Sequence, residues 1–140
     1  MSELEERHAR NQKIIDEFRS NAGKVGGPFE NIPLLILHNR GAKSGQERLN
    51  PVAYRRDGDN FVVFASKGGA PDNPDWFHNL KANPDTTVQI GRERRNVRAR
   101  VANPEERARL WPKAVKTYGG YADYQARAPR EIPVVILERR

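Results

Sequence analysis

Six apolar or alternating runs stand close together along this chain, and the short links between most of them constrain its fold more than any other feature. A parallel pair of strands needs a crossover of a dozen or more residues, so links this short favour antiparallel neighbours. A small barrel with helices packed on its outside closes such a set of strands, and we therefore expect a mainly β fold with peripheral helices. The expected strands are residues 33–37, 48–56, 60–66, 86–90, 94–102 and 133–137.

Three local signals shape the expected sheet. Residues 33–37 form a continuous apolar run, which predicts a strand that is buried on both faces. The sequence Asp57-Gly58-Asp59 predicts a tight hairpin turn. Pro51 cannot donate a backbone hydrogen bond, so we expect the strand over residues 48–56 to be broken or bulged there.

Helices are expected where capping residues precede a suitable segment. Asn103, followed by Pro104 and two acidic residues, predicts a helix that runs to about Thr117. Asn73 is placed to cap a short helix over residues 73–83, with Pro74 at its first position. Further helical segments are expected at residues 3–20 and 121–128, and the first has a thin apolar stripe made by Leu4, Ile14, Ile15 and Phe18.

The length of 140 residues suggests one folded domain, with a polar helix and loop over residues 1–27 and the barrel over residues 28–140. No apolar run approaches the roughly 18 residues that a membrane span needs. There are no cysteines, which excludes disulfide scaffolds, thiol catalysis and zinc bound by cysteine. The start of the chain is charged and not apolar, so we expect a cytoplasmic protein without a membrane span.

The charge balance indicates what kind of partner this chain binds. The formal net charge is +7, and the isoelectric point is about 10.0. A balance this basic favours an anionic partner, and nucleic acid, acidic lipid and a phosphorylated cofactor all qualify.

Two basic, glycine-bearing loops are the best candidates for an anion pocket. The first, residues 40–51, carries Lys43 and Arg48, and the second, residues 66–76, carries Lys67. Glycine lets the backbone approach a ligand, and successive free N–H groups form a concave site for phosphate or carboxylate oxygens. The dinucleotide and P-loop glycine patterns are both absent from the sequence. Taken singly, each loop is equally compatible with a solvated hairpin turn.

One expected strand is strongly basic on one face. Arg94, Arg98 and Arg100 lie at alternating positions, which suits either a surface that binds the nucleic-acid backbone or a solvated outer face. No aromatic residues suited to base stacking are interleaved there, so we favour the solvated face and expect no nucleic-acid partner. The inward partners on this strand are expected to be Val97, Ala99 and Val101.

Histidines and tyrosines complete the set of candidate functional side chains. The three histidines share no metal-ligand spacing, so no metal site is expected. Three tyrosines are spaced by three residues and form either a packing cluster or an aromatic wall for a flat substrate. These residues are His8, His38 and His78, and Tyr118, Tyr121 and Tyr124.

The order of these motifs resembles the deazaflavin-dependent nitroreductase family, over about residues 28–138. The resemblance is carried by the first loop, Gly41-Ala42-Lys43-Ser44-Gly45-Gln46-Glu47-Arg48-Leu49-Asn50-Pro51, and by the second, Ala65-Ser66-Lys67-Gly68-Gly69-Ala70. It continues in Asn73-Pro74-Asp75-Trp76-Phe77-His78-Asn79-Leu80-Lys81-Ala82-Asn83-Pro84 and in the tail Ile132-Pro133-Val134-Val135-Ile136.

This resemblance implies a six-stranded antiparallel split β-barrel of the FMN-binding type. It also implies coenzyme F-420, an 8-hydroxy-5-deazaflavin with a phosphate-linked oligoglutamate tail. Lys43 and Arg48 would hold the phosphate and the nearby tail, and Ser66 would hydrogen-bond the ring. The implied cofactor-binding residues are Lys43, Ser44, Arg48, Pro51, Ser66, Lys67, Gly68, Gly69, Pro74, Trp76 and Asn79.

The implied reaction is hydride transfer from the reduced deazaflavin to an electron-poor acceptor, such as a quinone or a nitroaromatic. Tyr118, Tyr121 and Tyr124 match a family cluster on the substrate side of the ring and, with Ser66, are the implied catalytic residues. A tyrosine or a water molecule would deliver the balancing proton. Ala53 stands where relatives can carry an aromatic residue, which implies a wider pocket. The charged N-terminal helix argues against peripheral contact with a membrane.

Three alternatives stay open at this point. A barrel reductase that uses FMN needs the same phosphate clamp, so Lys43 and Arg48 do not distinguish it. A basic barrel would instead bind nucleic acid through its arginine-rich strand. A carrier would bind the deazaflavin without catalysis. The sequence is compatible with a dimer.

Overall fold

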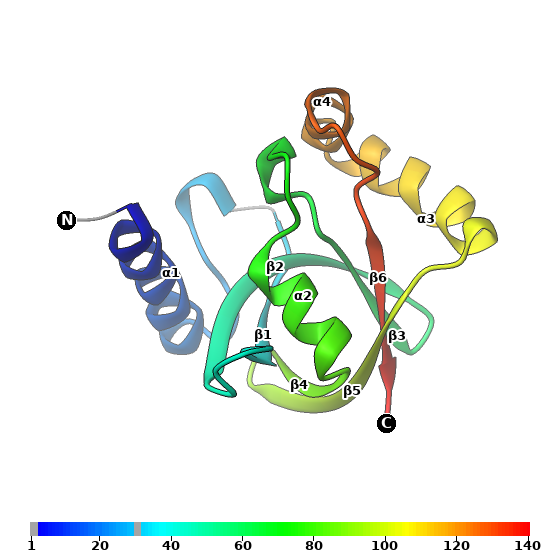
Figure 1. Ribbon diagram of the computed structural model, residues 1–140. Helices are drawn as coiled ribbons and strands as arrows, with labels where there is room; N and C mark the ends of the chain where they lie inside the picture. The colour runs from blue at the N-terminus through cyan, green and yellow to red at the C-terminus, as the bar shows by residue number, and fades with distance from the viewer. Residues whose placement is uncertain (1–2, 30–31) are drawn as a thin grey trace.

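In the described part of the chain, the structure is a closed barrel of six antiparallel strands with four α-helices, of which α2 fills the barrel interior. It is a computed structural model that describes residues 3–29 and 32–140 (Figure 1). The strand order around the barrel is β1-β2-β3-β6-β5-β4, and the expected antiparallel barrel is confirmed. The strands are β1 (Leu34–Arg40), β2 (Glu47–Asp57), β3 (Asn60–Phe64), β4 (Asp85–Ile90), β5 (Glu93–Val101) and β6 (Val134–Arg139).

The β2–β3 hairpin turns where the sequence predicts it. Asp57 pairs with Asn60, and Gly58 between them has φ +61°, a conformation that glycine adopts without steric cost. The last strand, β6, then pairs with both β3 and β5 and closes the barrel. The C-terminal apolar run therefore joins two hairpins that lie far apart in the sequence.

The expected break at Pro51 is wrong. β2 pairs with β1 in one unbroken register, in which Ile36 lies opposite Pro51. The N–H of Tyr54 donates to the carbonyl of Pro33 on the β1 side, so by strand alternation the nitrogen of Pro51 faces the other edge. β3 pairs with β2 only from Tyr54 onward, so the missing donor of Pro51 costs no ladder bond.

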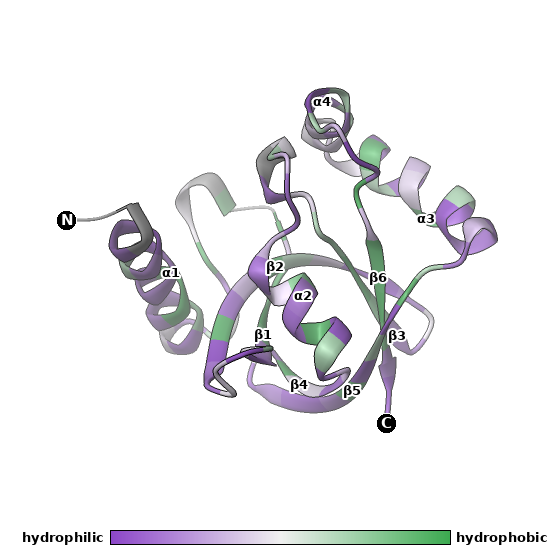
Figure 2. Cartoon of the chain, viewed as in Figure 1, coloured by the Kyte–Doolittle hydropathy of each residue, from purple (hydrophilic) through white to green (hydrophobic). Residues whose placement is uncertain are grey.

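The barrel interior is filled by alternate strand residues and is plugged by α2 (Asp75–Ala82). β1 sends Leu35 and Leu37 inward and Leu34 and Ile36 outward, and all four are buried, as its continuous apolar run predicts. Helix α2 runs across the barrel in Figure 1 and is partly apolar in Figure 2. Its residues Trp76, Phe77 and Leu80 join the interior cluster.

Two outer faces of the barrel are covered by helices. α3 (Pro104–Thr117), followed by α4 (Gly120–Arg127), packs Leu110 and Ala114 against the outward residues of β3 and β6. On another face, α1 (Glu3–Ser20) packs Ile15 and Phe18 against Leu34 and Ile36. α1 is mostly hydrophilic (Figure 2), which agrees with its thin apolar stripe. The side chain of Leu4, expected in that stripe, lies outside the described part of the chain.

The two predicted helix caps have opposite outcomes. Asn103 forms a full capping box with Glu106, because each side chain accepts a hydrogen bond from the backbone N–H of the other residue. The predicted cap at Asn73 is wrong, because α2 begins one residue later than that cap requires, with Pro74 at the N-cap. The amide oxygen of Asn73 instead accepts a hydrogen bond from Arg130, 2.6 Å away.

The basic face of β5 is largely occupied by ion pairs. Arg98 lies 2.6 Å from Asp85, and Arg100 bonds both Glu106 and Glu138. These carboxylates compete with any phosphate for the guanidinium groups. Val97 and Ala99 point inward as predicted, but Val101 is 49% exposed, because it is the last residue of its strand.

Candidate active site

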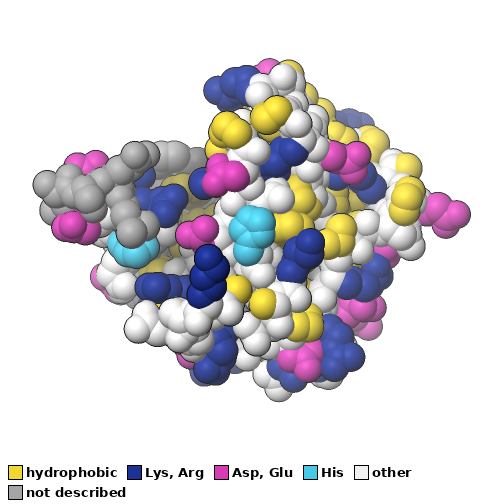
Figure 3. Space-filling model, in the orientation of Figure 1, with side chains coloured by type: hydrophobic (Ala, Val, Ile, Leu, Met, Phe, Trp, Pro, Cys, Tyr) yellow, Lys and Arg dark blue, Asp and Glu magenta, His cyan; other side chains and the backbone are white. Residues whose placement is uncertain are grey.

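One large cavity of about 1240 Å³ opens between α1, β2, the two glycine-bearing loops and the tyrosines of α4. Figure 3 shows basic and histidine side chains around a hollow on this face, between the α1 lobe and the remainder of the molecule. The volume exceeds the roughly 300–1,000 Å³ of most ligand pockets. There is therefore room for two flat molecules side by side, or for one long one.

The first loop brings two cations to the cavity. Lys43 lies in the turn after β1, and Arg48 lies at the start of β2, and both are exposed and line the cavity. Among the described residues, neither forms an ion pair within 4.0 Å, so both charges are available to an anion. The side chain of Ser44 also lines the cavity and accepts a hydrogen bond from the N–H of Gln46, which stabilises the turn.

A chain of buried and half-buried amide side chains fixes the first loop to the barrel and to α2. Asn79 donates to Asn39 over 2.8 Å, and Asn39 donates to Asn50 over 2.9 Å. The oxygen of Asn79 accepts a hydrogen bond from the backbone N–H of Ala42 in the loop. Asn79 is only 8% exposed, so in this structure it positions the loop through hydrogen bonds more than it offers polar atoms to a ligand.

The second loop contains the short 3-10 segment η2 (Lys67–Gly69) and follows β3 directly. Ser66 and Lys67 line the cavity. Lys67 has φ +45°, a strained conformation for a residue other than glycine, and its ammonium lies 3.2 Å from Asp72. Gly69 approaches the backbone of Tyr124 so closely that a Cβ atom would lie 2.8 Å from its carbonyl oxygen.

The three tyrosines gather at one wall of the cavity although the helix is broken between them. Tyr118 caps the C-terminus of α3, whereas Tyr121 and Tyr124 lie in α4. Their ring centroids are 5.2–6.3 Å apart, and the hydroxyls of Tyr118 and Tyr124 are 3.2 Å apart. Burial raises the pKa of Tyr121 to about 12, and the hydrogen bond shared with Tyr118 raises the pKa of Tyr124.

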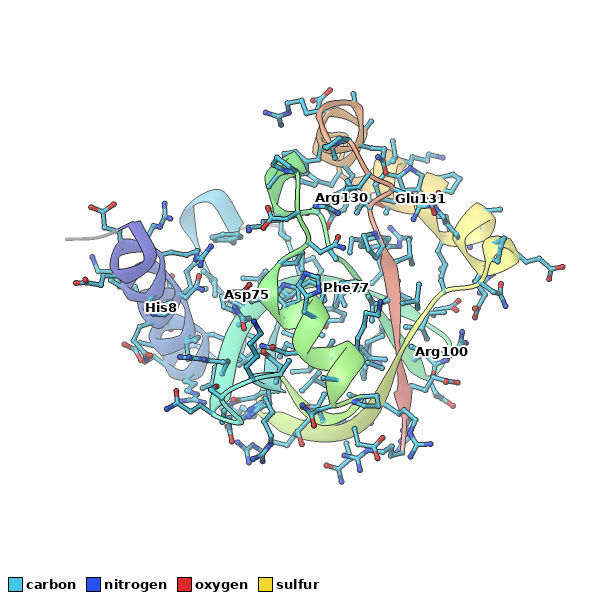
Figure 4. The ribbon with its side chains drawn as sticks, in the orientation of Figure 1. His8, Asp75, Phe77, Arg100, Arg130 and Glu131 are labelled. Carbon is cyan, nitrogen blue, oxygen red and sulfur yellow. The ribbon has the colours of Figure 1, made fainter. Side chains whose placement is uncertain are left out.

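Helix α1 forms a wall of the cavity that the sequence analysis did not assign to the site. Its polar residues Arg7, His8, Asn11 and Gln12 line the cavity beside the buried Ile15. His8 is labelled on this helix in Figure 4. Only the repeat of these positions every three to four residues marks them in the sequence, and a solvated helix face has the same repeat.

The structure brings most of the predicted site residues together. Gly69 is absent from the cavity lining and instead packs against α4, and the surroundings of Gly68 lie outside the described part of the structure. Other lining residues were not predicted, among them Tyr54, Asp75 and His78. The predicted residues that line the cavity are Lys43, Ser44, Arg48, Pro51, Ser66, Lys67, Pro74, Trp76, Asn79, Tyr118, Tyr121 and Tyr124.

Neither a metal cluster nor a membrane-crossing helix is found among the residues that the structure describes. No three acidic or histidine side chains there lie close enough to hold a metal ion. No helix there is both long and apolar enough to cross a membrane. His38 is buried and faces Glu47 over 3.0 Å, whereas His8 and His78 are exposed.

Two solved structures resemble this one over most of its length. A structure described as an F420-H2 dependent reductase is 40% identical, with a TM-score of 0.69, and the match covers 76% of this chain and 94% of that one. A structure described as a domain-swapped dimer is 34% identical, with a TM-score of 0.70, and the match covers 98% of this chain and all of the other.

Sequence comparison leads to the same family. An F420H(2)-dependent quinone reductase of Mycobacterium tuberculosis is 42% identical over 127 residues, which are 88% of this chain and 85% of that protein. The family model described as F420H(2)-dependent quinone reductase matches residues 10–139. This chain belongs to the F420H(2)-dependent quinone reductase family.

Proposed function

We propose that this protein is an oxidoreductase that uses reduced coenzyme F-420 to reduce an electron-poor acceptor, a quinone or a nitroaromatic. The observation that carries the proposal is one large cavity that is lined by cations of the first loop, by the second loop and by an aromatic wall. This arrangement suits a ligand with an anionic tail and a flat ring, and membership of the family makes coenzyme F-420 that ligand.

The residues present fit this coenzyme. Lys43 and Arg48 form no ion pair with a described residue, and a cation exposed at a cavity favours a phosphate or carboxylate partner. The volume of about 1240 Å³ leaves space for an acceptor beside the coenzyme. When bound, the coenzyme supplies a hydride from its reduced ring.

The chain would contribute binding, orientation and the exclusion of water. We assign Lys43 and Arg48 to the phosphate and the tail, and Ser66 and Lys67 to the ring side of the second loop. Trp76, buried at the start of α2, gives an apolar wall against which a ring can lie. Pro51, Pro74, Ser44 and Asn79 would shape the channel, and Gly68 and Gly69 would shape the loop.

The tyrosines would face the acceptor. Tyr118 and Tyr124 share a hydroxyl contact of 3.2 Å, so a proton can pass between them. The Tyr121 hydroxyl is protonated at neutral pH, and its raised pKa makes it a poorer proton donor than an ordinary tyrosine. We therefore assign Tyr121 to orienting the acceptor, and delivery of the proton to the exposed pair or to water.

A binding titration tests the cofactor. Purified protein is titrated in parallel with oxidised coenzyme F-420 and with FMN, with intrinsic tryptophan fluorescence as the signal, because Trp76 lines the cavity. We expect coenzyme F-420 to bind and FMN to bind at least about tenfold more weakly. Lys43→Ala and Arg48→Ala should each weaken coenzyme binding about tenfold, because each removes a charge-assisted contact.

The control for these variants is Lys113→Ala, since Lys113 is exposed on α3 and does not line the cavity. A preference for FMN would move the protein to the rival class of barrel reductases. Binding of neither compound would overturn the proposal. Turnover of a quinone with the reduced coenzyme, followed by absorbance, then separates an enzyme from a carrier.

A cytoplasmic location and a homodimer are further parts of this proposal. The first is supported by the absence of cysteines from the chain, and the second by the relative that is described as a domain-swapped dimer. Gel filtration at micromolar concentration distinguishes a dimer from a monomer of 16.0 kDa.

A further inference from the structure

Arg130 lies beside the second loop and binds three of its carbonyl groups. The guanidinium donates to the carbonyl oxygens of Ala65, Ser66 and Ala70 over 3.0–3.2 Å, and to the amide oxygen of Asn73 over 2.6 Å. Figure 4 labels Arg130 in the lead into β6, next to this loop and below α4. One side chain therefore joins both ends of the segment 65–73.

These contacts are of an unusual kind for a half-buried arginine. Among the described residues, no carboxylate lies within 4.0 Å of Arg130, and its four hydrogen bonds go to neutral oxygens of one loop. The rigid fork of five N–H donors in a guanidinium suits this geometry, and a lysine ammonium cannot reproduce it. The charge of Arg130 stays unneutralised by direct contact, which adds positive potential behind a loop that faces the cavity.

The loop that Arg130 holds is strained. Lys67 adopts φ +45°, and such a conformation persists only where its surroundings determine it. Two turn hydrogen bonds contribute, from Gly69 N–H to the Ser66 carbonyl and from Ala70 N–H to the Lys67 carbonyl. Arg130 binds the same Ser66 carbonyl, so it reinforces the turn that directs Ser66 and Lys67 to the cavity.

Arg130 also lies in the segment that follows the tyrosine-bearing helix α4. Gly69 touches the backbone of Tyr124 in α4, and the chain runs from the end of α4 at Arg127 directly to Arg130. The loop is thus held from two sides by one continuous segment. A shift of this segment would move Ser66 and Tyr124 relative to one another.

We propose that Arg130 is the positioning residue of the cavity, which fixes the second loop in its strained conformation and so sets the affinity for the coenzyme without touching it. Arg130 is not among the residues that line the cavity. The proposal rests on the proposed function for the identity of the ligand, but the order of the loop is measurable without any ligand.

The experiment combines coenzyme titration with hydrogen exchange on the full chain. Arg130→Ala should weaken binding of oxidised coenzyme F-420 at least about tenfold and speed exchange at the amides of Gly69 and Ala70. Arg130→Lys keeps the charge but loses the fork, so its affinity should lie between those of the parent and Arg130→Ala. Asn73 accepts one hydrogen bond from the guanidinium and does not line the cavity. Asn73→Ala should therefore also weaken coenzyme binding, but by less than Arg130→Ala.

Arg107→Ala is the matched control. Arg107 is also half-buried and binds the carbonyl of Ile132 in the segment that follows α4, but it forms no hydrogen bond to the described residues of the second loop. We expect its coenzyme affinity to stay within about threefold of the parent, even where its melting temperature falls as far as that of Arg130→Ala.

Each outcome decides a separate question. Coenzyme affinity in Arg130→Ala within about threefold of the parent overturns the proposal, and so does an equal loss in Arg107→Ala. A parent protein that binds no coenzyme F-420 overturns the proposed function instead. In that case the rates of amide hydrogen exchange at Gly69 and Ala70, compared between the parent and Arg130→Ala, decide whether Arg130 orders the loop. Full protection in Arg130→Ala would show that it does not.

Discussion

At the scale of single residues, Tyr121 shows how burial changes the acidity of a side chain. Its ring lies 5.1 Å from that of Phe64 and 6.0 Å from that of Trp111, between the barrel and α3. Burial is the main reason that its pKa rises from 10.0 to about 12, and the neighbouring Tyr118 and Tyr124 add to the rise. A hydroxyl in this environment keeps its proton and serves as a hydrogen-bond donor.

The raised pKa of Tyr121 predicts how stability falls at alkaline pH. Because the folded state keeps this proton more firmly than the unfolded state, the stability it contributes is full below pH 10.0 and is lost as pH rises towards about 12. Tyr121→Phe removes this dependence. Urea unfolding at several pH values should show a steeper loss for the parent than for the variant between pH 10.0 and about 12. Parallel curves would show that Tyr121 titrates normally.

At the scale of elements, the start of α3 is stabilised by one residue with two functions. Glu106 completes the capping box with Asn103 and also binds Arg100 of β5 over 2.6 and 2.7 Å. The hydrogen bond from Arg100 contributes most, and with the bond from the Asn103 N–H it lowers the pKa of Glu106 from 4.5 to about 2. The helix that covers the barrel and leads to the tyrosines is thereby fastened to a strand.

Glu106→Gln should destabilise the protein in a pH-dependent way. The depressed pKa means that the charge contributes stability above pH 4.5, which is lost as pH falls through about 2. At pH 7 the variant should lose about 1 kcal/mol of unfolding free energy, and the difference should shrink towards pH 2. Glu105→Gln, exposed in the same turn, is the control and should change the unfolding free energy by less than about 0.5 kcal/mol. If the difference does not depend on pH, the variant is destabilised by disturbed packing and not by loss of the ion pair.

At the scale of the whole molecule, α1 is part of the barrel's packing and of the cavity. Ile15 and Phe18 share an apolar cluster with Val25, Leu34 and Ile36, and Phe18 is fully buried. Ile15 also lines the cavity, together with residues of the preceding turns on the same side of the helix. The expected division at residue 27 therefore separates two segments that pack together.

Phe18→Ala tests whether α1 and the barrel unfold together. Removal of this ring should cost about 3–5 kcal/mol, because it leaves a cavity in a packed cluster. Both tryptophans, Trp76 and Trp111, lie outside α1, so their fluorescence reports on the rest of the molecule. We expect the denaturant midpoint by fluorescence to fall together with the midpoint by circular dichroism. Lys13→Ala, exposed on α1, is the control, and an unchanged fluorescence midpoint in Phe18→Ala would make α1 an independent unit.

Local signals in the sequence were sufficient for most elements and for the residues of the two loops. The capping box at Asn103, the turn at Gly58 and the continuous apolar run of β1 each depend on a few neighbouring residues. Where a local rule failed, a distant contact was the cause. Asn73 does not cap α2, because its side-chain oxygen accepts a hydrogen bond from Arg130. Pro51 is accommodated in β2, because β3 pairs with β2 only from Tyr54 onward.

What the sequence determined by itself was the set of strands, their antiparallel pairing, the basic loops and the family motifs, because hydrophobic periodicity, turn chemistry and charge are properties of neighbouring residues. Only the tertiary structure decided which of these residues are neighbours in space. Three arrangements join residues that are distant in sequence: the polar residues of α1 in the cavity wall, the amide chain from Asn79 to Asn50, and the hydrogen bonds of Arg130 to the second loop. Such contacts follow from closure of the barrel, which no local pattern encodes.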